Sequence, residues 1–361
     1  MRKQKRQSKR IANASENPLD FITQNRGSKT PILLKKYAYR ITSTIKSAIK
    51  GSVNHDPVAK QYIPQIQELK TLPEENTDPI GDAVHTPVKG IVHRYPDRTL
   101  FKPANICAVY CRYCFHREHV GPGSEILNSE ERHTAIEYIR NHPEIWEVIL
   151  TGGDPLILSP RHIAEIMTAL NTIEHVKVIR IHTRVPIADP ERINDSIIKS
   201  LKKHTEQSVK ALYMVLHINH AQEITPEVRN TLSNLHKAGI NLLSQSVLLK
   251  GVNDDAEILE NLYRELITLN VKPYYLHHPD LAPGTSHFRL PIKTGQKIMQ
   301  ELLGRLSGIC QPTYMLDIPG GHGKIPLTPC FIEELSEGGY TLTDYKGRTH
   351  NYAPQTEIKK R

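Results

Sequence analysis

The central part of the chain alternates between short apolar runs and longer segments whose apolar residues recur at helical spacing. The apolar runs predict strands at residues 99–105, 147–153, 176–183, 211–219, 241–249 and 272–278. Amphipathic segments between and after them predict helices at residues 130–142, 160–173, 193–204, 226–239, 256–270 and 295–306. Typical end residues support two of these helices, since Ser159 precedes Pro160 and Gly239 ends the segment that begins at residue 226.

Regular alternation of strands and helices indicates parallel strands joined by right-handed crossovers. Six such units are fewer than a full eight-fold barrel has and more than a small doubly wound sheet needs. The predicted fold is therefore α/β, with a partial (βα)6 barrel of six strands, and an open doubly wound sheet is the alternative. We expect four regions: a basic N-terminal extension with a possible helix at 39–51 (1–55), an irregular and partly helical lead-in (56–98), the barrel (99–310) and a C-terminal segment (311–361).

Polar residues and glycines gather at one end of the predicted strands. Those within or directly after a strand are Cys107, Gly152, Gly153, Asp154, His182, Arg184, His217, Asn219, His220, Gln245, His277, His278 and Asp280. A single histidine in such a place is more often a structural hydrogen-bonding residue than a ligand. Their recurrence after strand upon strand indicates an active site at the carboxyl ends of the parallel strands.

The formal net charge is +9, and the first ten residues, MRKQKRQSKR, hold six of the basic side chains. Such a tail can bind nucleic acid, but it lacks interleaved aromatic residues and no binding motif follows, which favours a solvated, disordered extension. No apolar run approaches membrane-spanning length, and no apolar signal segment follows the basic residues. Because the five cysteines are an odd number with three clustered, we expect a reducing, cytoplasmic compartment.

Three cysteines, Cys107, Cys111 and Cys114, stand within eight positions directly after the first predicted strand. Thiolates select zinc or iron–sulfur clusters, and a zinc site with His116 as the fourth ligand is one alternative. Each iron of a cubane cluster takes one thiolate, so three cysteines leave one iron open to bind a small molecule and act on it. The spacing C-x3-C-x2-C, with the aromatic Tyr113 before the last cysteine, resembles the signature of radical S-adenosylmethionine enzymes.

Between about residues 60 and 345 the chain resembles the lysine 2,3-aminomutase family. The similar stretches are IVHRYPDRTLF, CAVYCRYC, LTGGDPL, IRIHTRVP, HINHAQEIT, QSVLLKGVND, PYYLHHPDLAPGTSHFR and LDIPGGHGKIPL. The resemblance implies an isomerase with a radical S-adenosylmethionine partial barrel, which moves the 2-amino group of L-lysine to C3 and gives β-lysine. It also implies the route: the substrate forms an external aldimine with pyridoxal phosphate, and a 5′-deoxyadenosyl radical removes hydrogen from C3.

The family's cofactors are a [4Fe–4S] cluster, S-adenosylmethionine and pyridoxal 5′-phosphate. By resemblance, the three clustered cysteines hold the [4Fe–4S] cluster. The Gly152-Gly153-Asp154 turn matches a family motif that meets the methionine amino group, which suits a carboxylate beside close-packed glycines. His217 and Gln245 match family positions near the same cofactor. A flavodoxin or ferredoxin is the expected electron donor.

The segment PGGHGKIP contains Lys324, which resembles the family's pyridoxal phosphate lysine. A phosphate-binding loop is excluded by spacing, because Ile318 stands where its first glycine is required and Ile325 replaces its Ser/Thr. A lysine on a close-packed glycine loop instead suits a Schiff-base role. Arg98 matches the family arginine that contacts the cofactor phosphate.

Two aspartates, Asp280 and Asp317, match the family positions that bind the distal ammonium of the substrate. The family arginine that binds the substrate carboxylate is replaced by His116, followed by Arg117. Histidine lacks the bidentate fork of arginine, so our hypothesis is that Arg117 or a protonated His116 takes this task, or that the substrate is a lysine within a protein, as in the elongation-factor-P type of relative. Free L-lysine is the favoured substrate, and a metal-stabilised nucleic-acid-binding protein without catalysis is the alternative from another class.

The remaining cysteines, Cys310 and Cys330, match no ligand position and are expected to be buried thiols. Free-lysine members of the family also carry a zinc site with C-terminal cysteines. Asp255 stands where its partner cysteine is expected, so we expect no such site here.

Overall fold

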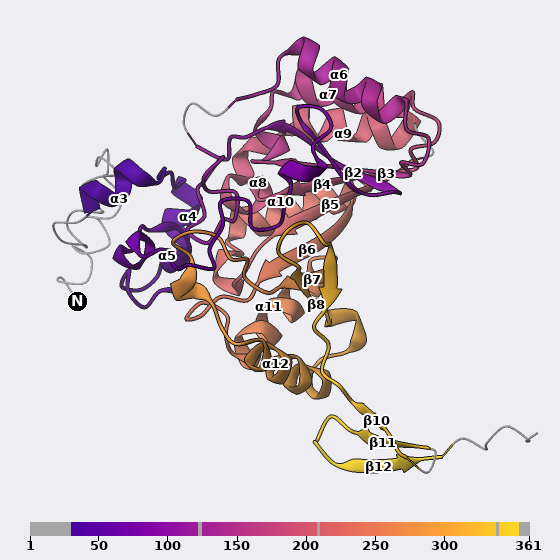
Figure 1. The fold of residues 1–361 in the computed structure, drawn as a ribbon. Coiled ribbons are helices and arrows are strands. Elements are labelled where there is room, and N and C mark those ends of the chain that lie inside the picture. The colour runs from indigo at the N-terminus through magenta and orange to yellow at the C-terminus, as the bar shows by residue number, and fades with distance from the viewer. Residues whose placement is uncertain (1–29, 122–124, 208–209, 337–338, 354–361) are drawn as a thin grey trace, which may run out of the picture.

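The fold is built around one curved sheet (Figure 1). The computed structural model describes residues 30–121, 125–207, 210–336 and 339–353, so the basic stretch at 1–10 lies outside the described residues. In the described part of the chain, the sheet has nine strands in sequence order: β1 Ile91–Tyr95, β2 Arg98–Ala104, β3 Glu147–Gly152, β4 Val178–Thr183, β5 Ala211–His217, β6 Asn241–Val247, β7 Val271–His277, β8 Thr313–Asp317 and β9 Lys324–Pro326.

The strands from β2 to β8 are parallel, and β1 and β9 pair antiparallel at the two edges. The six predicted strands are confirmed, as is the partial barrel. The structure adds β8 as a seventh parallel strand, paired with β7 from Tyr275 and Thr313 onward. Its five residues gave too short an apolar run to stand out in the sequence. Because β8 is parallel to β7, Asp317 at its end reaches the same rim as the ends of the other parallel strands.

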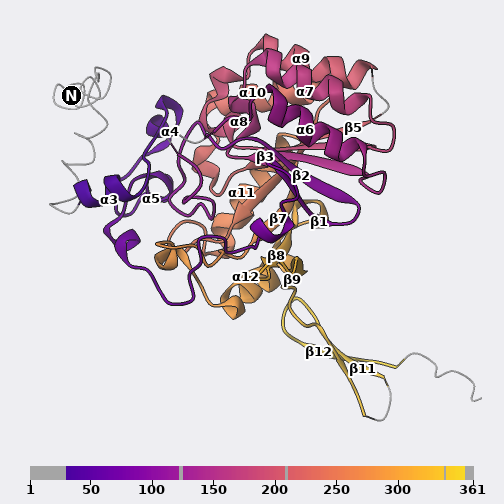
Figure 2. The ribbon, with the colours of Figure 1, turned by 45° about the horizontal axis from the view of Figure 1, so that its top comes forward.

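The predicted helices all form and cover the outer face of the sheet (Figures 1 and 2). They are α6 Ser129–Arg140, α7 Pro160–Asn171, α9 Asp195–Gln207, α10 Pro226–Lys237, α11 Ala256–Thr268 and α12 Ile292–Arg305. Local capping defines their starts: the Asn128 side chain accepts from the N–H of Glu131 while Glu131 caps Asn128 in return. Apolar faces such as Leu259, Leu262 and Leu266 of α11 are fully buried and form the core with the sheet. None of the helices within the described ranges is long and apolar enough to cross a membrane.

Short helices precede the sheet or lie between its strands. The short α-helices are α3 Thr30–Lys36, α4 Ser43–Ala48, α5 Pro57–Tyr62 and α8 Val185–Ala188. The 3-10 helices are η1 Ile66–Leu69, η2 Ala83–His85, η3 Pro155–Ile157, η4 Pro190–Arg192, η5 Ala221–Glu223, η6 Ser286–Phe288 and η7 Gly308–Cys310. The helix expected at 39–51 is limited to α4, because Thr42 caps its start and Ile49 turns to extended backbone.

After β9 the chain leaves the body as a three-stranded antiparallel arm (Figures 1 and 2). Its strands are β10 Ile332–Glu334, β11 Tyr340–Thr343 and β12 Thr349–Tyr352. Cys310 is buried as expected, but Cys330 is exposed, so the expectation of a buried thiol is wrong for Cys330. It lies on the segment that leads into the arm, where no second layer covers it, and its thiol donates to the Ile332 carbonyl.

Candidate active site

The cysteine loop follows β2 at the rim of the barrel. Cys107, Cys111 and Cys114 are all free and half-buried, and no disulfide joins them. Burial, then the charge of Asp154 and those of the neighbouring thiols, raises the pKa of Cys107, and burial with the charge of Cys111 brings the pKa of Cys114 to about 12. The raised pKa values of Cys107 and Cys114 favour protonated thiols until a metal group takes them as thiolates. Three thiols on one loop match in number the protein ligands of a cluster with one open iron, although among the described residues no three potential ligands stand close enough together to hold a metal ion.

The Gly152-Gly153-Asp154 turn lies against the cysteine loop. Its backbone donates from Gly153 N to Ala104 O at 2.8 Å and from Asp154 N to Ile106 O at 2.9 Å. A Cβ on Gly153 would stand 2.5 Å from the Ile106 carbonyl, and Gly152 has φ +112°. Larger residues would therefore push the turn away from the loop.

Asp154 has a different local role from the one its motif suggested. Its buried carboxylate accepts hydrogen bonds from Thr183 Oγ1 at 2.7 Å and from the backbone N–H groups of Arg184 at 2.7 Å, Leu156 at 3.0 Å and Val185 at 3.2 Å. With four protein donors, the carboxylate ties the end of β3 to the end of β4. The expected contact of this turn with a cofactor amine stays a prediction.

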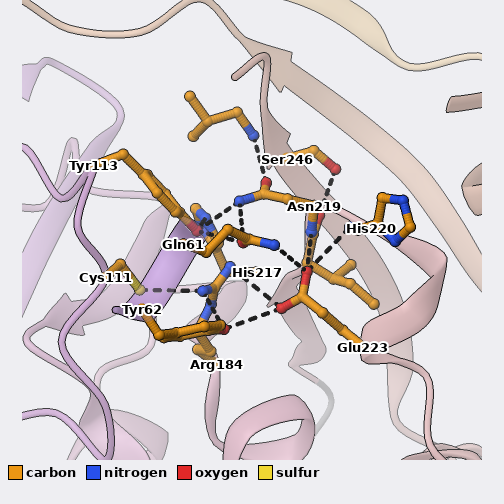
Figure 3. Close-up of polar contacts among 12 residues, drawn as sticks. Gln61, Tyr62, Cys111, Tyr113, Arg184, His217, Asn219, His220, Glu223 and Ser246 are labelled. Atoms are coloured by element: carbon orange, nitrogen blue, oxygen red, sulfur yellow. Dashed lines mark hydrogen bonds and ion pairs between the residues drawn. The ribbon is translucent and has the colours of Figure 1, made fainter. Parts of the chain in front are cut away.

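A buried polar network stands behind the cysteine loop (Figure 3). Arg184, just past β4, donates from Nη1 to Cys111 Sγ at 3.1 Å and to Tyr62 Oη at 2.5 Å. The Tyr62 hydroxyl in turn donates to Glu223 Oε2 at 3.0 Å, and the Arg184 guanidinium lies 4.0 Å from the same oxygen. The network places a positive charge next to the Cys111 sulfur and balances it with a fully buried carboxylate.

Removing this carboxylate is expected to destabilise the fold. Glu223→Ala leaves the buried Arg184 charge without its carboxylate partner and should lower the free energy of unfolding by about 3 kcal/mol or more. Urea unfolding monitored by circular dichroism measures this change. Glu227→Ala, an exposed glutamate on α10, is the matched control and should cost less than about 1 kcal/mol. A similarly small change in Glu223→Ala would contradict this account of the network.

His217 and Gln245 are brought together as expected, since they are paired residues of β5 and β6. Burial, with the nearby Arg184 charge, holds the pKa of His217 well below its usual range, so the ring is neutral. Its Nε2 atom lies 3.0 Å from the Tyr113 hydroxyl, which also accepts from Asn219 Nδ2 at 2.6 Å (Figure 3). The aromatic residue of the cysteine motif thus fixes the orientation of the histidine.

Lys324 lies at the start of β9, opposite Asp317 at the end of β8. Its Nζ donates to both Asp317 carboxylate oxygens, and its backbone N–H donates to the Tyr95 hydroxyl at 2.8 Å. Arg98 stacks 3.8 Å from the centre of the Tyr95 ring. A Cβ on Gly323, which has φ +92°, would stand 2.8 Å from the Tyr95 hydroxyl, so glycine is needed there. Lys324 and Arg98 therefore flank one tyrosine, an arrangement that fits an aldehyde cofactor with a phosphate.

Asp280 completes an acidic group with Asp317. Burial, and then the Asp317 charge, raises the pKa of Asp280 to about 7, although Lys324 acts in the opposite direction. Among the described residues, no side chain or backbone group hydrogen-bonds to the Asp280 carboxylate. His277 lies beside the pair, with Nδ1 3.8 Å from Asp317 Oδ2. The group is well suited to a cationic ligand.

The residues after the last cysteine are held apart. Arg117 is buried in an ion pair with Glu68 at 2.5 Å, and its guanidinium stacks 3.6 Å from the centre of the Tyr37 ring. His116 instead hydrogen-bonds through Nε2 to Asp82 Oδ2 at 3.2 Å. Burial would raise the pKa of Asp82, but the hydrogen bond and charge of His116, with Lys102, hold it well below its usual range. Of the two residues expected to bind a substrate carboxylate, Arg117 is thus already paired with Glu68 in the protein interior.

A family profile accounts for the part of the chain that carries the cysteine loop. The profile of the Radical SAM superfamily matches residues 101–262, from β2 into α11. The chain is therefore a radical S-adenosylmethionine enzyme, a class defined by a [4Fe–4S] cluster and S-adenosylmethionine. A second profile, Lysine-2,3-aminomutase, matches residues 299–360, which include Asp317 and Lys324.

Curated relatives match over most of the chain. The L-lysine 2,3-aminomutase of Clostridium subterminale is 37% identical over 320 residues, which are 89% of this chain and 76% of that protein. The L-lysine 2,3-aminomutase of Escherichia coli is 36% identical over 293 residues, which are 81% of this chain and 84% of that protein. The chain belongs to the lysine 2,3-aminomutase family of isomerases. The alternative of a nucleic-acid-binding protein without catalysis is therefore set aside.

Among solved structures, a radical SAM methyltransferase from Sphaerobacter thermophilus covers 63% of this chain and 68% of its own, at 20% identity and a TM-score of 0.44. A likeness of this degree carries no information on the reaction.

Proposed function

We propose that the enzyme moves the 2-amino group of free L-lysine to C3 and so forms β-lysine. The observation that supports this most directly is the acidic group of Asp280 and Asp317 beside Lys324, at the rim that also carries the cysteine loop. Two neighbouring carboxylates in a buried site favour a ligand with a distal ammonium. A glutamate-like substrate would be repelled.

The proposed cofactor contacts follow from the geometry of the rim. Cys107, Cys111 and Cys114 hold the [4Fe–4S] cluster, with Arg184 donating to the Cys111 sulfur. The backbone of the Gly152-Gly153-Asp154 turn, together with His217 and Gln245, contacts S-adenosylmethionine. We also propose residues 99–310 as the radical barrel, a flavodoxin or ferredoxin as the electron donor, and the cytoplasm as the compartment.

Pyridoxal phosphate is the proposed second cofactor, bound to Lys324 with its phosphate on Arg98. When bound, it supplies the carbonyl that accepts the amino group and the π system across which the nitrogen moves. Lys324 Nζ would hold this cofactor, and its present partner Asp317 would, together with Asp280, offer two carboxylates to the ε-ammonium of the substrate.

A lysine within a protein is the second candidate substrate. The observation that favours it is the histidine at position 116, which is held by Asp82, while Arg117 is buried against Glu68. A peptide-bound lysine has no free carboxylate and would need neither residue. We favour free lysine because two other cationic side chains, Arg94 and Lys102, contact the same Asp82 carboxylate as His116 and could bind a free carboxylate.

The raised pKa of Asp280 predicts a pH dependence of substrate capture. Below pH 7 the carboxyl becomes neutral and attracts the ε-ammonium less, so kcat/KM for L-lysine should fall by up to about tenfold per pH unit. Initial rates from pH 5.5 to 8.5 measure this profile. Asp280→Asn should lower kcat/KM by roughly 10- to 100-fold and remove the inflection near pH 7. An inflection that persists in Asp280→Asn would show that another group is responsible.

A further inference from the structure

Asp82, directly before η2, is surrounded by cationic side chains. Its buried carboxylate contacts Arg94 Nη2 at 3.0 Å, Lys102 Nζ at 3.2 Å and His116 Nε2 at 3.2 Å. One carboxylate thus faces an ammonium, a guanidinium and an imidazole. The buried Arg94 Nε has no hydrogen-bond partner. An ammonium has three donors, and for Lys102 the contact with Asp82 uses one. This basic group, formed by Lys102, Arg94 and His116 around Asp82, has capacity for a second anion.

The same group stands between the two proposed cofactor sites. A Cβ on Gly152 would lie 3.1 Å from Lys102 Cβ, so Lys102 flanks the Gly-Gly-Asp turn. On the other side, a Cβ on Gly81 would lie 2.5 Å from Gly321 N, and His85 Nε2 lies 3.1 Å from Gly321 O. The segment that carries Asp82 therefore packs on the loop that leads to Lys324. A substrate that meets both cofactors must occupy this space.

The basic group and the acidic group face one site. The segment that carries Asp82 packs against Gly321, which lies on the loop between Asp317 and Lys324, so the two groups are adjacent. The site is thus acidic at Asp280 and Asp317 and basic at Lys102 and Arg94. A free amino acid with an ammonium at the end of its side chain carries the complementary charges at its two ends. A lysine within a protein carries only the ammonium at the end of its side chain.

We propose that Lys102, supported by Arg94 and His116, binds the carboxylate of the amino-acid substrate, the task that the family gives to an arginine at position 116. The assignment rests on the proposed function and adds the residue that distinguishes a free amino acid from a peptide lysine. Asp82 holds the Lys102 ammonium at a fixed point, which offsets the flexibility of its side chain. Arg117 does not compete for the task, because Glu68 holds it in the protein interior.

The test compares L-lysine with L-lysinamide, which keeps the distal ammonium and lacks the carboxylate. Calorimetry on the enzyme with cluster and pyridoxal phosphate, without S-adenosylmethionine, gives both dissociation constants in the absence of turnover. The wild-type enzyme should bind L-lysine more tightly by roughly 10- to 100-fold. Lys102→Met should bring this ratio close to one, and Lys102→Arg should largely keep it. Lys89→Met, at a surface lysine paired with Glu125 and Glu131, is the control and should leave the ratio unchanged.

Each other outcome overturns the assignment. A wild-type preference for L-lysine that survives in Lys102→Met would mean that Lys102 merely balances Asp82. If Lys102→Met kept the preference for L-lysine and bound S-adenosylmethionine more weakly, Lys102 would contact that cofactor instead of the substrate. A wild-type enzyme that binds neither ligand would instead overturn the proposed function itself, and this assignment with it.

Discussion

Lys324→Ala is expected to lower the formation of β-lysine by at least about a thousandfold, because the variant has no amine to bind pyridoxal phosphate at the rim. Reductive cleavage of S-adenosylmethionine should persist, since Lys324 hydrogen-bonds to Asp317 and Tyr95 and, among the described residues, to none of the cysteine loop. Product analysis by mass spectrometry and the yield of 5′-deoxyadenosine measure the two effects separately. The absorbance of bound pyridoxal phosphate should also disappear.

Lys346→Ala is the matched control, because Lys346 is an exposed lysine on the C-terminal arm. This variant should keep the cofactor absorbance and the rate of β-lysine formation. A Lys324→Ala enzyme that still binds pyridoxal phosphate covalently would contradict the assignment of this lysine.

Cys111→Ala is expected to abolish both reactions. The loss of one of three thiolates leaves the cluster with two protein ligands, and the missing sulfur is also the atom that Arg184 contacts. Iron and sulfide content should fall sharply, and the yield of 5′-deoxyadenosine should drop by at least about a thousandfold. Elemental analysis, electron paramagnetic resonance of the reduced protein and the cleavage assay check these results.

Cys330→Ala removes an exposed thiol outside the loop and should change none of these quantities. If Cys111→Ala kept a full complement of iron and cleaved S-adenosylmethionine, the cluster would have to be held elsewhere.

The regular elements of the barrel could be predicted from the sequence because each follows from local pattern. Alternating strands and amphipathic helices specify parallel units, and the three cysteines lie within eight positions of one another. The short β8 and the arm strands were missed, since three to five residues carry too little periodicity. Their pairing depends on neighbours that are distant in the sequence.

The side-chain contacts of the site required the fold. The sequence placed Asp154 in the cofactor motif, but its four protein donors come partly from β4, about 30 residues further on. Asp82, in the segment before β1, likewise meets Lys102 of β2 only in the folded chain. One signal was present: Lys102 interrupts the apolar pattern of β2 with a charge next to the strand's carboxyl end. An inward charge at that point indicates a ligand or a buried partner.

The central claim is tested most directly by one anaerobic assay. The protein is reconstituted with iron and sulfide, supplied with pyridoxal phosphate, S-adenosylmethionine and a reductant, and incubated with isotope-labelled L-lysine. The account predicts labelled β-lysine in the wild-type reaction and none with Lys324→Ala or Cys111→Ala. Reductive cleavage of S-adenosylmethionine with the labelled lysine unchanged would contradict it, and a lysine within a protein would then be the next substrate to test.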